Sequence, residues 1–241
     1  MNAQTLIYCF PHAGAAAPST SAWQSYVDGA LRFEAVRYPG HGHRFCEPLA
    51  TSIEAIAKDW IESQAPLDSR STVFFGHSMG SLVAYETCRQ LQARDQPLPR
   101  HLIVSGRAAP HLPRTRIAPD TLPDDELIDY LRALGGMPPE VLNDAQMCEL
   151  LVPIARADFA ACRHYKPDAS TPLPIGVTVY AGDDDDLTPD ELEGWAAHTR
   201  ASFDIRRFAG GHFYLDTSVD LFLSSLRRDV QPDGSAHDVL C

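Results

Sequence analysis

Long hydrophobic runs and an excess of positive charge are both missing from this sequence. None of its apolar segments approaches the roughly 20 residues that a membrane-spanning helix needs. The 20 basic side chains are outnumbered by 32 acidic ones, which gives a formal net charge of −12. A field of that sign repels the phosphates of nucleic acids and the headgroups of anionic lipids. We therefore expect a protein that binds neither nucleic acid nor membrane.

Paired cysteines and a targeting segment are missing as well. The six cysteines form no C-x-x-C pair and are scattered along 241 residues, which indicates reduced thiols and no zinc site. Residues 1–5 carry no basic side chain and lead directly into the short apolar segment Leu6–Phe10. A signal peptide needs a basic start and an apolar core of about 7–15 residues. We therefore expect a cytoplasmic protein.

The sequence alternates short apolar segments with amphipathic ones. The apolar segments mostly lack polar alternation, as buried strands of a parallel sheet do; they are Leu6–Phe10, Phe33–Tyr38, Thr72–Phe75, His101–Ser105, Ile175–Ala181 and Ser202–Phe208. Helices are predicted over Ser52–Gln64, Ser81–Arg94, Pro189–Arg200 and Tyr214–Arg227. The alternation predicts an α/β fold with one mostly parallel central sheet flanked by helices, and we interpret residues 1–241 as a single domain.

The alternation breaks between residues 110 and 166. One helix is predicted to start near Thr121–Asp124 and to end at Gly135-Gly136. A second is predicted from about Asn143 to His164. Because no strand interrupts this stretch, we expect a helical lid inserted at 110–166. Two further helices packed on the sheet are the alternative.

The segment Gly76-His77-Ser78-Met79-Gly80 fits the G-x-S-x-G pattern of a nucleophile elbow. A predicted strand leads into it and a predicted helix leads out, which is the context that the motif requires. Gly76 and Gly80 lack the Cβ atoms that would clash where the chain folds back, so the Ser78 hydroxyl can stand clear of the sheet. We interpret Ser78 as a catalytic nucleophile; a glycine-rich turn with an unused serine is the alternative.

A nucleophilic serine needs a base, and the base needs an acid that orients it. His212 follows the last predicted strand, where the chain order Ser…Asp…His places the base. The acid is expected in the run Asp183-Asp184-Asp185-Asp186, which follows a strand ending near Gly182. Many α/β-hydrolases place it three residues after the glycine. That spacing selects Asp185, with Asp184 as the alternative.

Two backbone N–H groups must hold the negative oxygen that forms when the serine attacks. Met79, the residue after the nucleophile, is one expected donor. The other is expected from the loop after the first strand, where small residues let the backbone approach a ligand closely. We choose Ala13 for this role, with His12 as the alternative.

Taken together, these motifs resemble the type II thioesterases, the discrete α/β-hydrolases that accompany nonribosomal peptide and polyketide synthases. The resemblance spans nearly the whole chain in order. It is carried by Phe-Pro-His-Ala-Gly at 10–14, Tyr-Pro-Gly-His-Gly at 38–42, Gly-His-Ser-Met-Gly-Ser-Leu-Val-Ala-Tyr-Glu at 76–86, Leu-Pro-Asp-Asp-Glu-Leu at 122–127, Leu-Gly-Gly at 134–136, Ala-Asp at 157–158 and Gly-Gly-His-Phe at 210–213.

The resemblance implies an α/β-hydrolase fold and a triad of Ser78, Asp185 and His212. It implies hydrolysis of acyl or aminoacyl thioesters on the phosphopantetheine arm of acyl- or peptidyl-carrier protein domains, which clears stalled or mis-primed synthase modules. It also implies no metal and no bound cofactor, since the phosphopantetheine belongs to the substrate.

Other interpretations stay open. The chain could be a chain-releasing fatty-acyl thioesterase or a serine esterase of the same fold; a non-catalytic scaffold is disfavoured by the intact pair of Ser78 and His212. We expect a monomer. An acidic carrier partner would need a local basic patch, for which the candidates are Arg107, Arg114, Arg116, Arg163, His164 and Lys166. Apolar residues of the lid either line an acyl channel or pack the lid onto the body; they are Leu131, Leu134, Met137, Met147 and Leu151.

Overall fold

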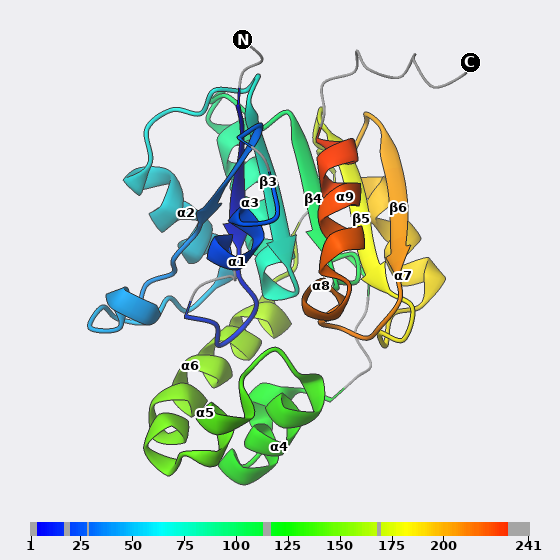
Figure 1. Ribbon diagram of the computed structural model, residues 1–241. Helices are drawn as coiled ribbons and strands as arrows, with labels where there is room; N and C mark the ends of the chain where they lie inside the picture. The colour runs from blue at the N-terminus through cyan, green and yellow to red at the C-terminus, as the bar shows by residue number, and fades with distance from the viewer. Residues whose placement is uncertain (1–3, 17–19, 28, 113–116, 168–169, 231–241) are drawn as a thin grey trace.

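The computed structural model describes residues 4–16, 20–27, 29–112, 117–167 and 170–230. At its centre is a six-stranded sheet in the order β2-β1-β3-β4-β5-β6, and all neighbouring strands are parallel (Figure 1). The predicted α/β class with a parallel sheet is confirmed. The strands are β1 (Thr5–Phe10), β2 (Leu31–Ala35), β3 (Thr72–His77), β4 (His101–Ser105), β5 (Gly176–Gly182) and β6 (Phe203–Phe208).

The sheet is buried on both faces, because successive residues of β3 point into two different apolar clusters. Phe74 packs with Trp60 of α2 (Ile53–Ser63) and with α3 (Met79–Ala93). Phe75 packs on the opposite face with Trp23 of α1 (Thr20–Gln24) and Phe222 of α9 (Val219–Asp229). The strands β3 and β5 are buried throughout and so need no polar alternation, whereas the edge strands β2 and β6 keep exposed residues.

Two of the predicted helices are divided in the structure. The segment predicted as one helix from Pro189 forms α7 (Pro189–Glu193) and a 3₁₀ turn over Gly194–His198. The segment from Tyr214 forms α8 (Tyr214–Thr217) and α9. Ser218 separates these two helices because its φ of −118° and ψ of 41° lie outside the helical region. Helix α1 was not predicted, because five residues are too few to show a helical period.

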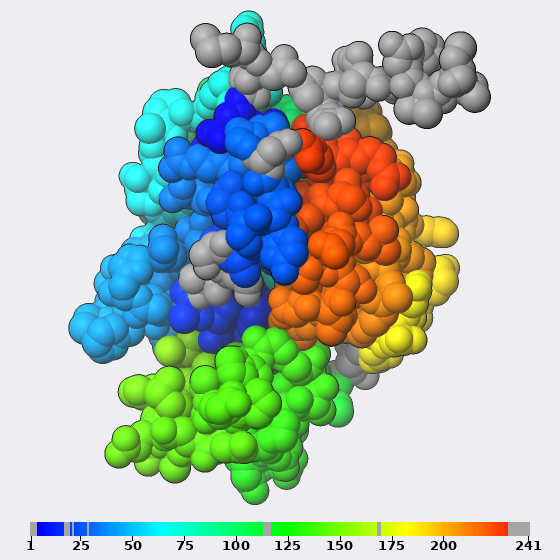
Figure 2. Space-filling view, in the orientation of Figure 1, coloured from blue at the N-terminus to red at the C-terminus, as the bar shows by residue number. Residues whose placement is uncertain are grey.

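A helical insertion lies between β4 and β5. It contains α4 (Asp124–Leu134), α5 (Pro139–Asn143) and α6 (Ala145–His164). These helices form a lobe at one end of the sheet, drawn in green in Figure 1, and have an apolar cluster of their own. In the space-filling view the insertion covers this end of the body and touches both its blue N-terminal part and its orange C-terminal part (Figure 2).

The second predicted helix of this region is α6, which starts within two residues of the predicted position and ends at His164 as predicted. The chain is extended at Asp144, which has a φ of −94° and a ψ of 115°, so α5 and α6 are separate helices. The Asp144 carboxylate accepts hydrogen bonds from the N–H groups of Gln146 and Met147 at 2.8 and 3.2 Å. Such an N-cap stabilises a helix by about 1 kcal/mol. The helix therefore begins at Ala145, and the residues up to Asn143 form the separate short helix α5.

Three further observations concern the described part of the chain. No helix there combines the length and the apolar composition needed to cross a bilayer. The cysteines at 9, 46, 88 and 148 are free thiols, and Cys241 lies outside the described residues. No three His, Cys, Asp or Glu side chains come together there in a way that could hold a metal ion.

The first testable consequence concerns Gly80, where α3 begins against the end of β1. A Cβ atom at this position would lie 2.0 Å from the carbonyl oxygen of Phe10. We predict that Gly80→Ala lowers the free energy of unfolding, measured by urea denaturation, by about 3 kcal/mol or more, because backbone must move to admit the methyl group.

Gly29→Ala is the matched control, since a Cβ atom there meets nothing within 4 Å. We expect its free energy of unfolding to change by no more than about 0.5 kcal/mol. If Gly80→Ala were as stable as this control, the close approach of α3 to β1 would not be a constraint on the fold.

Candidate active site

Ser78 occupies a strained turn between β3 and α3. Its φ of 55° and ψ of −115° are unusual for a residue with a side chain. The turn is held from below, because the Ser78 N–H donates to the carbonyl oxygen of Ser105 at 2.7 Å and the Ser81 hydroxyl donates to that of Gly76 at 2.8 Å. A Cβ atom on Gly76 would lie 2.2 Å from the carbonyl oxygen of Gly80, so the tight turn requires glycine. This geometry is that of a nucleophile elbow.

His212 and Asp185 are joined by a hydrogen bond. Nδ1 of His212 lies 2.9 Å from Oδ2 of Asp185, and the two side chains are only 13% and 8% exposed. The neighbouring strands β5 and β6 end at the same edge of the sheet, and their following loops are joined by the N–H of Asp184, which donates to the carbonyl oxygen of Gly210 at 3.0 Å. This pairing brings His212 to the aspartate run.

Two of the other aspartates of the run lie in more exposed positions. The Asp183 carboxylate binds Arg207 at 2.8 Å, and both Asp183 and Asp184 are exposed. Of the two carboxylates that the sequence left open for the triad, Asp185 is therefore the one that contacts His212.

The His212 ring lies beside the turn that carries Ser78. Its centroid is 4.9 Å from that of His77, the residue before Ser78. A Cβ atom on Gly106 would lie 2.9 Å from Cε1 of His77 and 3.1 Å from Cε1 of His212, so both rings flank this glycine at the end of β4. The serine, the histidine and the aspartate thus come from three neighbouring parts of the same sheet edge.

His77 is placed for structure and not for proton transfer. Its Nδ1 lies 2.9 Å from the hydroxyl of Ser105, which in turn lies 2.7 Å from that of Tyr214. Burial, together with the nearby imidazoles of His212 and His12, holds the pKa of His77 well below its ordinary value. His77 is therefore neutral near pH 7 and supports the turn from beneath.

The loop after β1 passes over the start of α3. A Cβ atom on Gly80 would lie 2.8 Å from the carbonyl oxygen of Pro11, so this loop brings the buried Ala13 towards the buried Met79. His12 bonds to the carbonyl oxygen of Ala13 at 2.9 Å, and burial lowers the pKa of His12 to about 4. The N–H of Gly14 is already engaged, because it donates to a carboxylate of α6.

An apolar cavity of about 420 Å³ lies between this loop and the insertion. Of the five apolar insertion residues predicted either to line an acyl channel or to pack the insertion onto the body, three line this cavity, namely Met137, Met147 and Leu151. The wall also includes His12, His77 and Phe213, which places the cavity next to Ser78 and His212. A cavity of this size and polarity can hold an apolar group beside the turn of Ser78.

The remaining two insertion residues lie elsewhere. Leu131 is 2% exposed and belongs to the apolar cluster inside the insertion, and Leu134 lies outside the cavity wall. Leu150 and Ile154 also line the cavity, although neither was among the predicted lining residues. The signal for them was present, because Met147, Leu150, Leu151 and Ile154 recur every three or four residues and so share one face of α6.

The structure describes four of the six candidate residues of the basic patch, namely Arg107, Arg163, His164 and Lys166. Arg107 is buried, and the Arg163 guanidinium binds the Asp120 carboxylate at 2.6 Å. His164 and Lys166 are exposed. Arg114 and Arg116 lie outside the described residues.

The difference between Leu131 and Met147 can be tested. We predict that Leu131→Ala lowers the free energy of unfolding by about 2–5 kcal/mol, because it leaves a hole in the core of the insertion. Met147 lines the cavity and is 42% exposed, so Met147→Ala should cost less than about 1 kcal/mol. Urea denaturation measures both changes, and equal losses would mean that Met147 packs in the core instead of lining the cavity.

Comparison with known proteins identifies the family. The Thioesterase domain family matches residues 5–229. Linear gramicidin dehydrogenase LgrE of Brevibacillus parabrevis is 35% identical over 233 residues, which cover 95% of this chain and 89% of that protein. The solved structure of RedJ, a thioesterase from the prodiginine biosynthetic pathway in Streptomyces coelicolor, is 33% identical, has a TM-score of 0.83, and is matched over 94% of this chain and 90% of that one.

A second solved structure has the same relationship. BorB, the type II thioesterase from the borrelidin biosynthetic cluster, is 29% identical with a TM-score of 0.81, over 96% of this chain and 94% of its own. Both solved structures match the fold of this chain along almost their entire length. The chain therefore belongs to the thioesterase family, and its relatives are the type II thioesterases of nonribosomal peptide and polyketide pathways, as its motifs indicated.

Proposed function

We propose that this protein hydrolyses acyl or aminoacyl thioesters held on the phosphopantetheine arm of carrier-protein domains, with Ser78, His212 and Asp185 as its catalytic triad. The observation that carries the proposal is the hydrogen bond of 2.9 Å between His212 and Asp185 beside the strained turn of Ser78. Family membership supports the type of bond that is cleaved. Relatives from the prodiginine biosynthetic pathway and the borrelidin biosynthetic cluster support the role of clearing stalled or mis-primed synthase modules.

The first half of the reaction forms an acyl-enzyme. The Ser78 hydroxyl oxygen attacks the thioester carbonyl carbon while Nε2 of His212 takes its proton. The N–H groups of Met79 and Ala13 donate to the negative oxygen of the tetrahedral intermediate. The carbon–sulfur bond then breaks, and the thiolate takes a proton from His212. A thiol has a pKa of about 8.5, so it leaves far more readily than an amine would.

The second half releases the acid. A water molecule gives a proton to Nε2 of His212 and attacks the acyl carbon, and Ser78 leaves as its alkoxide and regains a proton from His212. Asp185 accepts a hydrogen bond from Nδ1 throughout, which fixes the ring and stabilises its positive charge. These steps use side chains and water, with no metal or bound cofactor.

The insertion serves as a lid over one α/β-hydrolase domain in this proposal. The cavity under it, lined by Met137, Met147 and Leu151, takes the acyl chain, while the pantetheine arm enters from the carrier protein. The enzyme acts as a cytoplasmic monomer with no role for nucleic acid or membrane.

Three alternatives are less well supported. A serine esterase or a chain-releasing fatty-acyl thioesterase would use the same triad. Only the substrate preference of the enzyme can therefore distinguish these activities from the proposed one. The name of LgrE refers to a dehydrogenase, and dehydrogenases of the doubly wound type carry G-x-G-x-x-G after a strand. This sequence contains no such spacing of glycines, and the elbow of Ser78 favours hydrolysis.

Replacement of the nucleophile tests the proposal directly. Ser78→Ala should leave the fold intact and reduce kcat on an acyl-carrier protein by about 10⁶-fold, because only the attacking hydroxyl is lost. Intact-mass measurement of the acyl-carrier protein follows the loss of the acyl group. If Ser78→Ala kept a kcat within tenfold of the parent, Ser78 would be excluded as the nucleophile. If the parent enzyme hydrolysed a simple oxygen ester faster than the acyl-carrier protein, the esterase would be favoured.

The aspartate run offers a matched pair of variants. Asp185→Asn should slow kcat by about 10³–10⁴-fold, because an amide no longer stabilises the positive charge on His212. Asp184→Asn should retain the parental kcat, since Asp184 is exposed and only its backbone contributes to the loop. The reverse outcome would move the triad acid by one residue.

A further inference from the structure

A buried charged contact outside the triad joins the insertion to the two loops beside the site. Oδ2 of Asp158, in α6, lies 2.9 Å from Nε2 of His41 in the loop after β2. The same oxygen accepts the N–H of Gly14, in the loop after β1, at 2.7 Å. The side chains of His41 and Asp158 are each only 3% exposed. Three segments that are far apart in the sequence thus meet at one carboxylate oxygen.

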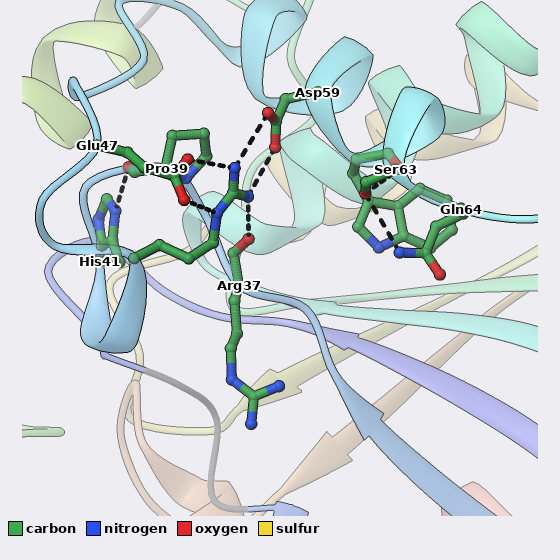
Figure 3. Close-up of polar contacts among 9 residues, drawn as sticks. Arg37, Pro39, His41, Glu47, Asp59, Ser63 and Gln64 are labelled. Carbon is green, nitrogen blue, oxygen red and sulfur yellow. Dashed lines mark hydrogen bonds and ion pairs between the residues drawn. The ribbon is translucent and has the colours of Figure 1, made fainter.

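The hydrogen-bond partners of His41 define its protonation. Its Nδ1 lies 2.9 Å from the carbonyl oxygen of Pro39 (Figure 3), and its Nε2 faces the Asp158 carboxylate. Both partners are acceptors, so both ring nitrogens must donate, which requires the imidazolium form. Burial opposes this charge, but the hydrogen bond and the charge of Asp158 outweigh it and raise the pKa of His41. The contact is therefore an ion pair.

The loop that carries His41 is itself held firmly. The Arg44 guanidinium donates to the Asp59 carboxylate at 2.8 Å and to the carbonyl oxygen of Arg37 at 3.1 Å, and it also binds Glu47 (Figure 3). From the same loop, the Tyr38 hydroxyl donates to the carbonyl oxygen of Pro11 at 3.1 Å. These contacts hold the loop after β2, and with it His41, in place against the loop after β1.

Stability alone does not explain such a pair. Removing two charges from water costs free energy that their attraction often fails to recover, and apolar residues of the same volume can replace buried pairs without loss. Here Asp158 also binds the N–H of Gly14, the residue that follows Ala13. Both Gly14 and His41 line the cavity. An amide held in one orientation is what an oxyanion donor needs, because it must point at the oxygen before the reaction begins.

We propose that Asp158 and His41 are positioning residues that orient the loop after β1, so that the N–H of Ala13 is directed at the oxyanion only when α6 is seated on the body. This inference rests on the proposed function. It assigns to the insertion a second task besides covering the acyl chain. If α6 moves away, Gly14 loses its acceptor and His41 loses its counter-charge, and the donor next to them is no longer fixed.

Three variants test the positioning role on a short-chain acyl-pantetheine thioester. Asp158→Asn keeps the shape of the side chain and removes its charge, and His41→Gln keeps a donor and removes the cation. We expect each to lower kcat by about 10–100-fold with KM changed by less than about threefold, as a misplaced donor should. The double variant should fall within about threefold of the slower single variant, because both changes break one interaction.

Tyr165→Phe is the matched control. The Tyr165 hydroxyl donates to Oε2 of Glu86 at 2.8 Å, so this change removes another buried contact between the end of α6 and the body without touching Gly14. It should lower thermal stability and leave kcat within about twofold of the parent, as expected for a contact remote from the reacting atoms.

A second readout isolates the oxyanion. A trifluoromethyl-ketone analogue of the substrate forms a tetrahedral adduct on Ser78, and its inhibition constant should rise in Asp158→Asn by about the same factor as kcat/KM falls. Parental kcat in both single variants, or an unchanged inhibition constant despite a lower kcat, would overturn the positioning role alone. A parent enzyme that does not cleave the thioester would overturn the proposed function and this inference with it.

Discussion

The close crossing of α3 over the end of β1 is the constraint on which the rest of the site depends. It exists because Gly80 has no Cβ atom, which would otherwise lie 2.0 Å from the carbonyl oxygen of Phe10. The crossing forces the chain at Ser78 into a positive φ and lifts its side chain above the sheet. It also lays the loop after β1 over the start of the helix. One steric condition therefore brings together a candidate nucleophile and the backbone of its candidate oxyanion donors.

The parallel sheet provides the second condition. All strands end at one edge, so the loops after β1, β3, β5 and β6 collect there. His12 and His77 fill the space beneath the site as neutral rings, since burial keeps the pKa of each below its ordinary value. The positive charge that His212 would carry during catalysis is thus flanked by uncharged imidazoles and faces the Asp185 carboxylate. The strong negative charge of the whole chain is compatible with this local arrangement, because a short hydrogen bond outweighs a distant, screened field.

The helical insertion combines two kinds of contact. Inside, it packs Leu127, Leu131 and Leu142 in an apolar cluster of its own. Towards the body, Ala161 and Tyr165 join the main apolar cluster. Buried polar contacts are added to this packing, namely those of Asp158 with Gly14 and His41, and of Tyr165 with Glu86. Directional contacts fix a geometry more sharply than apolar ones of the same area. A lobe held in this way can rest on the body in one defined position, with the cavity between them.

The sequence by itself determined the features that depend on local pattern. Apolar segments predicted the strands, G-x-S-x-G between a strand and a helix predicted the elbow at Ser78, and the ordered motifs indicated the family. Tertiary structure decided what depends on pairing between distant segments. The register of β5 against β6 aligns Gly182 with Phe208 and so directs Asp185, from four adjacent carboxylates, to His212. The fold of the insertion buries Leu131 in the insertion's own core and places Met147 in the wall of the cavity. In the sequence both are apolar residues of predicted helices, and nothing local distinguishes them. The contact of His41 with Asp158 spans 117 positions, and no local pattern contains it, because a hydrogen bond depends on distance in space and not on distance along the chain.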